Sequence, residues 1–256
     1  MEFATRDALK EYIKRYWSNG SEQYDKRTIG KLKEETDVYR NALHSTLQGD
    51  NLKILDIGTG TGFLALMLAE MGHRVTGLDM TEGMMDKAKH HAEVDKLTID
   101  FRLGDAESLP FDNGSFDAVV CRWVLWTLPD QTRALSEWSR VTKTGGQMLV
   151  FDGQWRTNTF GSKLAQGIKR VGALIYDGQN PWKYHYAKDV DKYLTSPDGV
   201  SPARAKQLFQ DAGLKNIKLN MLPEAGKMQR KGSPLLYKLG SSPNIFLISG
   251  NTGATS

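Results

Sequence analysis

Cysteine is nearly absent from this chain of 256 residues, because Cys121 is the only one. A single cysteine excludes an internal disulfide and any metal site built from several cysteines, and we predict no metal site. The sequence has no run of about 18 apolar residues, which argues against a membrane-spanning helix. Its first residues also lack the apolar centre of a signal peptide. We therefore expect a cytoplasmic protein.

A strong excess of charge of either sign is missing too. The formal net charge is +4, and hydrophobic and charged residues make up 39% and 25% of the chain, which are ordinary globular values. Basic residues are scattered, with small clusters at 10–15 and 227–231, whereas a nucleic-acid surface needs a denser stripe. The composition therefore argues against a nucleic-acid partner. The length fits either one α/β domain with an additional segment or one large α/β domain.

The most informative stretch runs from residue 53 to residue 62. Residues 54–57 form a short and mostly apolar run, typical of a strand buried on both faces of a parallel sheet. Three glycines alternate with threonines over 58–62. Residues 63–71 are mostly apolar and have high helix propensity, which predicts a buried helix. Glycine lets a ligand approach the bare N–H groups of such a strand–turn–helix junction. This stretch therefore predicts a ligand site.

Two common phosphate-binding motifs do not fit this stretch. The dinucleotide fingerprint G-x-G-x-x-G/A, counted from Gly58 and Gly60, ends on the bulky Phe63, and the P-loop pattern is absent. The next predicted strand, over 73–80, brings Asp79 to the same edge of the sheet. A carboxylate there can accept hydrogen bonds from both hydroxyls of a ribose. A nucleoside-containing ligand is therefore the interpretation that we favour.

Strand and helix patterns alternate five times along the chain. Further strands are predicted at 99–103, at 115–122 and at 147–151, with a helix around 131–141 before the last of these. Such alternation requires a parallel sheet with right-handed crossovers. Two more strands are predicted at 216–222 and 244–249, after a helix at 202–212.

Four stretches match the motifs of a known family. They are Asp56-x-Gly58-x-Gly60-x-Gly62, the segment Asp79-Met-Thr-Glu-Gly-Met-Met, the segment Gly104-Asp-Ala-Glu-Ser-Leu-Pro-Phe, and the turn Thr144-Gly-Gly. Together they resemble the class I S-adenosylmethionine (SAM)-dependent methyltransferases, and in particular the ubiquinone/menaquinone C-methyltransferase-like group (methyltransferase type 11). The resemblance implies a Rossmann-like sheet of seven mostly parallel strands with helices on both faces, an antiparallel final strand, an N-terminal helical lid and an insertion after strand five.

The resemblance also implies roles for single residues. The carboxylate of Asp79 would hold the ribose, Asp105 and the N–H of Ala106 would read the adenine edge, and Cys121 with Arg122 would lie beside the methionine part of SAM. An N-terminal segment of the form Tyr-Trp…Tyr-Asp folds over the cofactor in related enzymes; here the same aromatics could instead only dock the N-terminal helices. The implied cofactor contacts are Tyr16, Trp17, Tyr24, Asp56, Gly58, Thr59, Gly60, Asp79, Met80, Asp105, Ala106, Cys121 and Arg122.

These patterns divide the chain into four parts. They are a helical lid at 1–48, a SAM-binding core at 49–153, a cap insertion at 154–200 and a C-terminal helix with a strand hairpin at 201–256. Aromatic residues concentrate in the insertion, at the rim where an apolar or planar acceptor would enter, although they could equally tie the insertion down. The predicted acceptor pocket consists of Trp123, Trp126, Tyr176, Trp182, Tyr184 and His185.

The implied reaction is the in-line transfer of a methyl group from SAM to a small molecule, with S-adenosylhomocysteine as the product. A general base is needed only if the acceptor must lose a proton, and the candidates are His185, Asp152 and Tyr24. Two alternatives stay open. One is an RNA or protein methyltransferase that uses Arg122 and the basic loop at 226–232, and the other is a non-catalytic SAM-binding domain.

Overall fold

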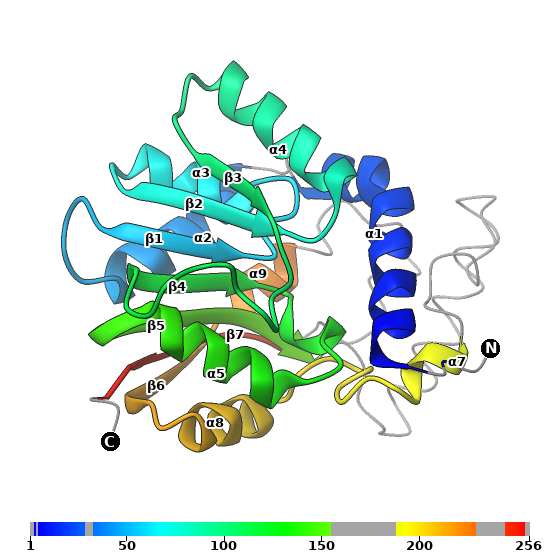
Figure 1. The fold of residues 1–256 in the computed structure, drawn as a ribbon. Helices are drawn as coiled ribbons and strands as arrows, with labels where there is room; N and C mark the ends of the chain where they lie inside the picture. Colours follow the sequence, from blue (N-terminus) through cyan, green and yellow to red (C-terminus); the bar gives the residue numbers. More distant parts are fainter. Residues whose placement is uncertain (1–2, 4, 29–32, 155–187, 229–243, 254–256) are drawn as a thin grey trace.

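The computed structural model describes residues 3, 5–28, 33–154, 188–228 and 244–253. Their strands form one sheet in the order β3-β2-β1-β4-β5-β7-β6 (Figure 1). The strands are β1 (Lys53–Ile57), β2 (Arg74–Asp79), β3 (Asp100–Leu103), β4 (Phe116–Arg122), β5 (Thr142–Gln154), β6 (Lys215–Met221) and β7 (Asn244–Asn251).

The direction of the strands confirms the predicted topology. The strands from β1 to β5 pair in parallel, whereas β7 runs antiparallel to both β5 and β6. The parallel strands need crossovers, and helices supply those from β1 to β2, from β2 to β3 and from β4 to β5. The described helices are α1 (Arg6–Thr28), α2 (Lys33–Thr46), α3 (Phe63–Glu70), α4 (Glu82–Val94), the 3₁₀ turn η1 (Leu125–Thr127), α5 (Gln131–Val141), α7 (Lys188–Asp191), α8 (Pro202–Asp211) and α9 (Pro223–Met228).

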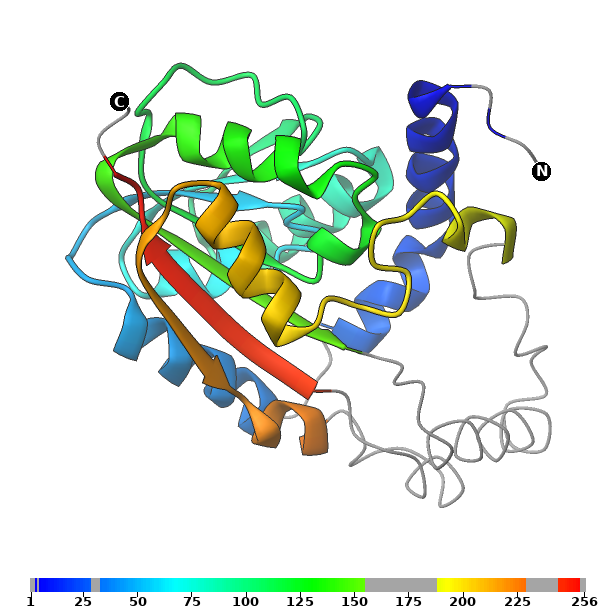
Figure 2. The same cartoon turned by 90° about the horizontal axis from the view of Figure 1, so that it is seen from below.

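Two apolar layers cover the two faces of the sheet. Neighbouring residues of β1 point to opposite faces: Leu55 packs in a buried cluster with Trp138 of α5, and Ile54 packs in a second one with Tyr39 of α2. Figure 2 shows α5 and α8 on one side of the sheet and α2 and α9 on the other. This burial on both faces explains why the central strands β1 and β4 read as nearly continuous apolar runs.

The N-terminal helix differs from its prediction. The spacing of Leu9, Ile13 and Tyr16 predicts an amphipathic helix over 5–17 that stops before Asn19-Gly20. Instead, α1 continues through this pair to Thr28. A glycine inside a helix costs only about 1 kcal/mol, and contacts with α4 hold the second half of α1. Lys87 lies 2.6 Å from Glu22 and His91 lies 2.9 Å from Asp25.

The position of α1 matters for the site. Figure 1 shows α1 crossing the edge of the sheet at which the parallel strands end. By contrast, α2 covers a face of the sheet, where Tyr39 and Leu43 are fully buried. Only the first of the two N-terminal helices therefore lies over the ligand-binding edge. Within the described ranges, no helix is long and apolar enough to cross a membrane.

Candidate active site

A cavity of about 410 Å³ lies between α1 and the carboxyl ends of the parallel strands. The loops after β1, β2, β3 and β4 all contribute to its wall. The strand order places β1 beside β4, although β1 continues in the chain to β2 on its other side. Open α/β sheets bind ligands at such a switch point.

The turn after β1 has a backbone that favours glycine. Gly58 and Gly60 have φ values of +62° and +56°, which side chains with a Cβ rarely adopt. A Cβ on Gly58 would lie 2.4 Å from Cγ2 of Val124. The N–H of Thr59 donates to the carbonyl of Leu78 at 2.9 Å, which fixes the turn against β2.

Asp56 stabilises this turn through a hydrogen bond to Thr59. Its Oδ2 accepts a hydrogen bond of 2.7 Å from Oγ1 of Thr59, and both residues are buried. Burial raises the pKa of Asp56 to about 7, although the Thr59 hydrogen bond and the charge of Arg122 oppose the rise. Asp56 and Thr59 therefore shape the turn and do not line the cavity.

Asp79 ends β2 and faces the cavity. Its Oδ2 accepts from the N–H of Gly60 at 2.9 Å, and its Oδ1 accepts from the N–H and Oγ1 of Thr81 at 3.0 and 2.8 Å. Burial raises the pKa of this carboxyl, against the effect of these hydrogen bonds. The turn after β1 and the acid after β2 thus form one hydrogen-bonded unit.

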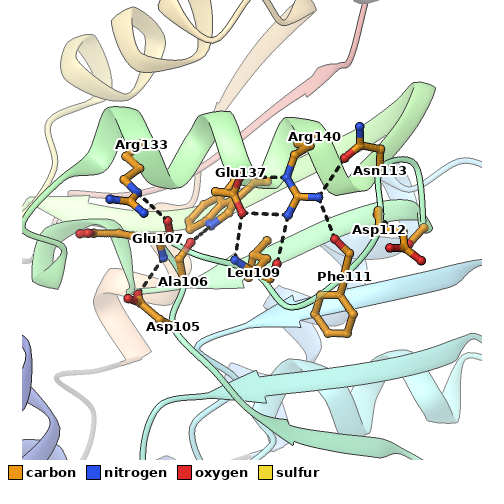
Figure 3. A network of polar contacts seen from close by, with 12 residues as sticks. Asp105, Ala106, Glu107, Leu109, Phe111, Asp112, Asn113, Arg133, Glu137 and Arg140 are labelled. Atoms are coloured by element: carbon orange, nitrogen blue, oxygen red, sulfur yellow. Dashed lines mark hydrogen bonds and ion pairs between the residues drawn. The ribbon is translucent and has the colours of Figure 1, made fainter.

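The third part of the wall is the loop after β3. Asp105 Oδ1 accepts from the N–H of Glu107 at 2.8 Å (Figure 3). Lys10 of α1 reaches this loop, and its Nζ lies 2.6 Å from Oδ2 of Asp105 and 2.7 Å from Oε2 of Glu107. The side chain of Glu107 is fully buried. Lys10 therefore attaches α1 to the loop through a largely buried ion pair.

The far side of this loop is fixed to α5. Trp138 Nε1 donates to the carbonyl of Ala106 at 2.9 Å, and Arg140 Nη2 donates to the carbonyl of Leu109 at 3.0 Å. The N–H of Leu109 in turn donates to Oε2 of Glu137 at 3.0 Å. Figure 3 shows these bonds joining α5 to the loop. The backbone of Ala106 is thereby held at the cavity wall.

Arg122 ends β4 and also lines the cavity. The residue is only 5% exposed. Its guanidinium carbon lies 3.9 Å from the centre of the Phe63 ring and 4.0 Å from that of Trp123. Nη2 donates a long hydrogen bond of 3.4 Å to the Tyr24 hydroxyl. The positively charged side chain of Arg122 thus forms the wall of the cavity at the end of β4.

The structure brings together most of the residues predicted from the sequence. Twelve of them line the one cavity, although they come from α1 and from the ends of four strands. These are Tyr16, Trp17, Tyr24, Gly58, Gly60, Asp79, Met80, Asp105, Ala106, Arg122, Trp123 and Trp126. The aromatic rings adjoin one another, because the Trp17 ring centre lies 5.7 Å from that of Tyr24 and 6.1 Å from that of Trp126.

Besides Asp56 and Thr59, two further predicted site residues do not line the cavity. Cys121 is fully buried among the apolar residues that pack against α5 and α8, and burial raises the pKa of its thiol. Asp152, predicted as a general base, is also fully buried, and its Oδ1 accepts from the N–H of Gly153 at 2.8 Å. Burial raises the pKa of Asp152 to about 8. Neither residue lines the cavity, so this geometry gives no support to their predicted roles, which stay predictions.

The remaining acceptor-pocket predictions, Tyr176, Trp182, Tyr184 and His185, lie outside the described residues. Sequence reasoning in turn missed Lys10, Glu107 and Asp191 as residues of the cavity wall. Lys10 gave no local signal, since its partner Asp105 lies 95 positions away in the chain.

The glycine turn, the acid after the second strand and the open edge beside them are the features with which Rossmann-like folds bind nucleosides. Comparison with known proteins narrows this class. Residues 55–150 match the family described as "Methyltransferase domain", and these residues contain the ends of the strands that form the cavity.

Named relatives agree with this match. A demethylmenaquinone methyltransferase of Deinococcus radiodurans is 31% identical over 183 residues, which cover 69% of this chain and 73% of the relative. A ubiquinone biosynthesis O-methyltransferase of Coxiella burnetii is 39% identical over 104 residues, but the match covers only 41% of this chain and 44% of the relative.

A solved structure shares the fold. Haemonchus contortus phospholethanolamine N-methyltransferase 2, in complex with phosphomonomethylethanolamine and S-adenosylhomocysteine, superposes with a TM-score of 0.69 at 16% identity, over 96% of this chain and 60% of that chain. The similarity to the Deinococcus radiodurans enzyme shows the family, and the fold agrees with it. The chain belongs to the class I SAM-dependent methyltransferases.

Proposed function

We propose that this protein transfers a methyl group from SAM to a small-molecule acceptor by in-line displacement. The observation that carries the proposal is the convergence of the Gly58–Gly60 turn, Asp79 and Asp105 on one cavity. Bound SAM would supply an activated methyl group, so the chain itself needs mainly to align the two reactants. Alignment alone can contribute roughly 7–11 kcal/mol to the lowering of a barrier.

The wall of the cavity fits the parts of SAM in order along the sheet edge. Asp105 and the backbone of Ala106 would hold the adenine, and Asp79 would hold the ribose hydroxyls. The turn at Gly60 would lie under the ribose, since a Cβ there would lie 3.4 Å from the Tyr24 ring and would narrow the space. The tail of the molecule would then run towards β4.

The acceptor would enter between α1 and η1. Ile13, Trp17, Trp126 and Leu128 give this part of the cavity an apolar and aromatic wall, which suits a planar or apolar molecule. Helix α1 forms one wall of the cavity, and its ion pairs at Lys10 would keep it closed over the bound reactants. Exclusion of water would protect the reacting groups.

Of the three bases predicted for removal of a proton from the acceptor, Tyr24 is the one that lines the described part of the cavity. Tyr24 lines the cavity and its hydroxyl contacts Arg122. Asp152 lacks access because it is fully buried. We propose that Tyr24 orients the reactants, and that an acceptor which attacks without losing a proton needs no base.

Methylation of RNA or protein finds less support. It would require a continuous basic rim, yet Arg122 is buried and Lys227 pairs with Glu224 at 2.7 Å. The other members of that rim, Arg230 and Lys231, lie outside the described residues. A small-molecule acceptor therefore stays the proposal.

Calorimetric titration with S-adenosylhomocysteine tests the cofactor site. We expect a one-to-one complex, and Asp79→Ala should weaken it more than about tenfold, because charge-assisted hydrogen bonds to the ribose contribute roughly 1.5–3 kcal/mol. Asp100→Ala is the matched control, since Asp100 is exposed on β3 and pairs only with Arg102 in the described contacts. Unchanged affinity in Asp79→Ala would refute our placement of the ribose.

Transfer of labelled methyl groups from SAM into small molecules of a cell extract tests the activity itself. Mass spectrometry of the labelled products would identify the acceptor. Binding of the cofactor without any labelled product from a competent extract would favour a non-catalytic SAM-binding domain.

A further inference from the structure

A buried glutamine adjoins the acceptor end of the cavity and joins three segments of the chain. Gln131, the first residue of α5, is only 1% exposed. Its Nε2 donates to the carbonyl of Leu125 at 2.9 Å and to Oγ of Ser196 at 3.0 Å. Its Oε1 accepts a hydrogen bond of 3.3 Å from Nε of Arg204. One amide therefore connects η1, the segment after α7 and α8.

Two of these partners directly precede residues of the cavity wall. The carbonyl of Leu125 belongs to the peptide bond that leads into Trp126, and Ser196 precedes Pro197. Trp126 and Pro197 both line the cavity, whereas Gln131 does not. The hydrogen bonds of the Gln131 amide therefore fix these two parts of the wall relative to each other, although they come from separate segments of the chain.

A buried amide holds its partners more strictly than an apolar side chain of similar volume would. If η1 or the segment after α7 shifts, a buried donor or acceptor loses its partner, which costs free energy. A buried network in which the members are bonded therefore favours one arrangement. Gln131 meets this condition, because its amide nitrogen makes two hydrogen bonds and its carbonyl oxygen accepts a third.

We infer that Gln131 is a positioning residue, which acts through Trp126 and Pro197 to fix the shape of the acceptor end and thereby the choice among acceptors. This inference rests on the function proposed above, in which the acceptor lies against Trp126. Preorganised walls bind one shape well, whereas walls that can move accept several. Loss of the amide should relax the selectivity among acceptors. It should leave cofactor binding intact, because Asp79 and Asp105 lie in other segments, at and after the ends of β2 and β3.

The experiment measures this selectivity as a ratio of products. The wild type and Gln131→Met are each incubated with isotope-labelled SAM and the small-molecule fraction of a cell extract, and mass spectrometry gives the initial rate of each labelled product. Acceptors that compete in one mixture are methylated according to their kcat/KM values, so a ratio of products does not depend on the amount of active enzyme.

We expect the ratio of the main product to all other labelled products to be about tenfold lower in Gln131→Met than in the wild type, as for the loss of two hydrogen bonds. Where the wild type gives a single product, further products should appear in the variant. Calorimetry should show an affinity for S-adenosylhomocysteine within about twofold of that of the wild type.

Controls separate this role from a general effect on stability. Gln207→Met removes an exposed glutamine hydrogen bond of 2.7 Å to Asp211 on α8 and should leave the product ratio unchanged. Ser196→Ala removes only the bond from Gln131 to the segment after α7, so it should lower the ratio by a smaller factor. It takes the place of Gln131→Met if that variant does not fold.

An unchanged product ratio in Gln131→Met, or in Ser196→Ala where that variant takes its place, would overturn the inference. An equally large loss of affinity for S-adenosylhomocysteine would also overturn it, because the whole site would then be distorted. Failure of the wild type to bind the cofactor or to label any product would instead refute the proposed function.

Discussion

Substitution of Gly58 by alanine tests the turn that organises the site. Two costs follow from the structure. The φ of +62° is unfavourable for alanine by roughly 1–2 kcal/mol. The added Cβ would lie 2.4 Å from Cγ2 of Val124, well inside the optimal carbon–carbon separation of about 3.5–4.0 Å. Relief of such an overlap in a packed core costs roughly 1–3 kcal/mol, so Gly58→Ala should lower the free energy of unfolding by roughly 2–5 kcal/mol.

The two costs can be separated by urea unfolding of a set of variants. Gly72→Ala is the control for the backbone cost, since Gly72 has a φ of +87° and nothing lies within 4 Å of its Cβ position; we expect a loss of only about 1–2 kcal/mol. Val124→Ala removes the group that the new Cβ meets. In the double variant Gly58→Ala/Val124→Ala the overlap disappears. Its loss in the free energy of unfolding should therefore be smaller than the sum of the two single losses by roughly 1–3 kcal/mol.

One result would refute this reasoning. If Gly58→Ala destabilises no more than Gly72→Ala, and the double variant shows no coupling, then Val124 moves aside without cost. The close packing of the turn against the segment after β4 would then not be the reason for glycine at this position.

Two further predictions concern buried charges. Lys10→Met should lower the free energy of unfolding by about 2–3 kcal/mol, because Glu107 stays buried without its cation. A loss below about 0.5 kcal/mol in urea unfolding would show that the ion pair of Lys10 and Glu107 contributes no more than a surface salt bridge. Asp152 has its pKa raised to about 8 by burial, so the native state holds a proton that the unfolded chain releases above about pH 4; stability should fall as pH rises from about 4 to 8. Asp152→Asn should make this slope shallower, although Asp56 with its raised pKa still contributes to it, and should raise stability at pH 8 by about 1–4 kcal/mol. An unchanged slope in urea unfolding at several pH values would contradict the burial argument.

The sequence predicts the sheet and the glycine turn well because their signals are local. The run 54–57 has few alternatives to a buried strand, and the glycines that follow it mark the turn on their own. Asp79 and Asp105 could be placed for the same reason, since each lies at or just after the end of a predicted strand. The sheet then brings them to one edge.

Other features depend on contacts that a local pattern does not contain. A strand that is buried on both faces shows no alternation, so the sequence does not distinguish Cys121, which packs towards α5, from Arg122, which packs against Phe63. The continuation of α1 past Gly20 depends on α4, and the role of Lys10 depends on a loop far away in the chain. These are tertiary effects that override or add to local propensity.

The charges on the cavity wall have an order that single residues do not reveal. Asp105 and Asp79 lie at the ends of β3 and β2, whereas Arg122 lies at the end of β4, so the edge of the sheet is acidic at one end and basic at the other. A nucleoside offers hydroxyl and amino donors to the acidic end, and a carboxylate suits the basic end. The two ends can be tested separately, because Asp79→Ala should weaken S-adenosylhomocysteine and its decarboxylated analogue alike, whereas Arg122→Met should weaken only the former. Equal weakening of both ligands by Arg122→Met would mean that the amino-acid tail does not end beside β4.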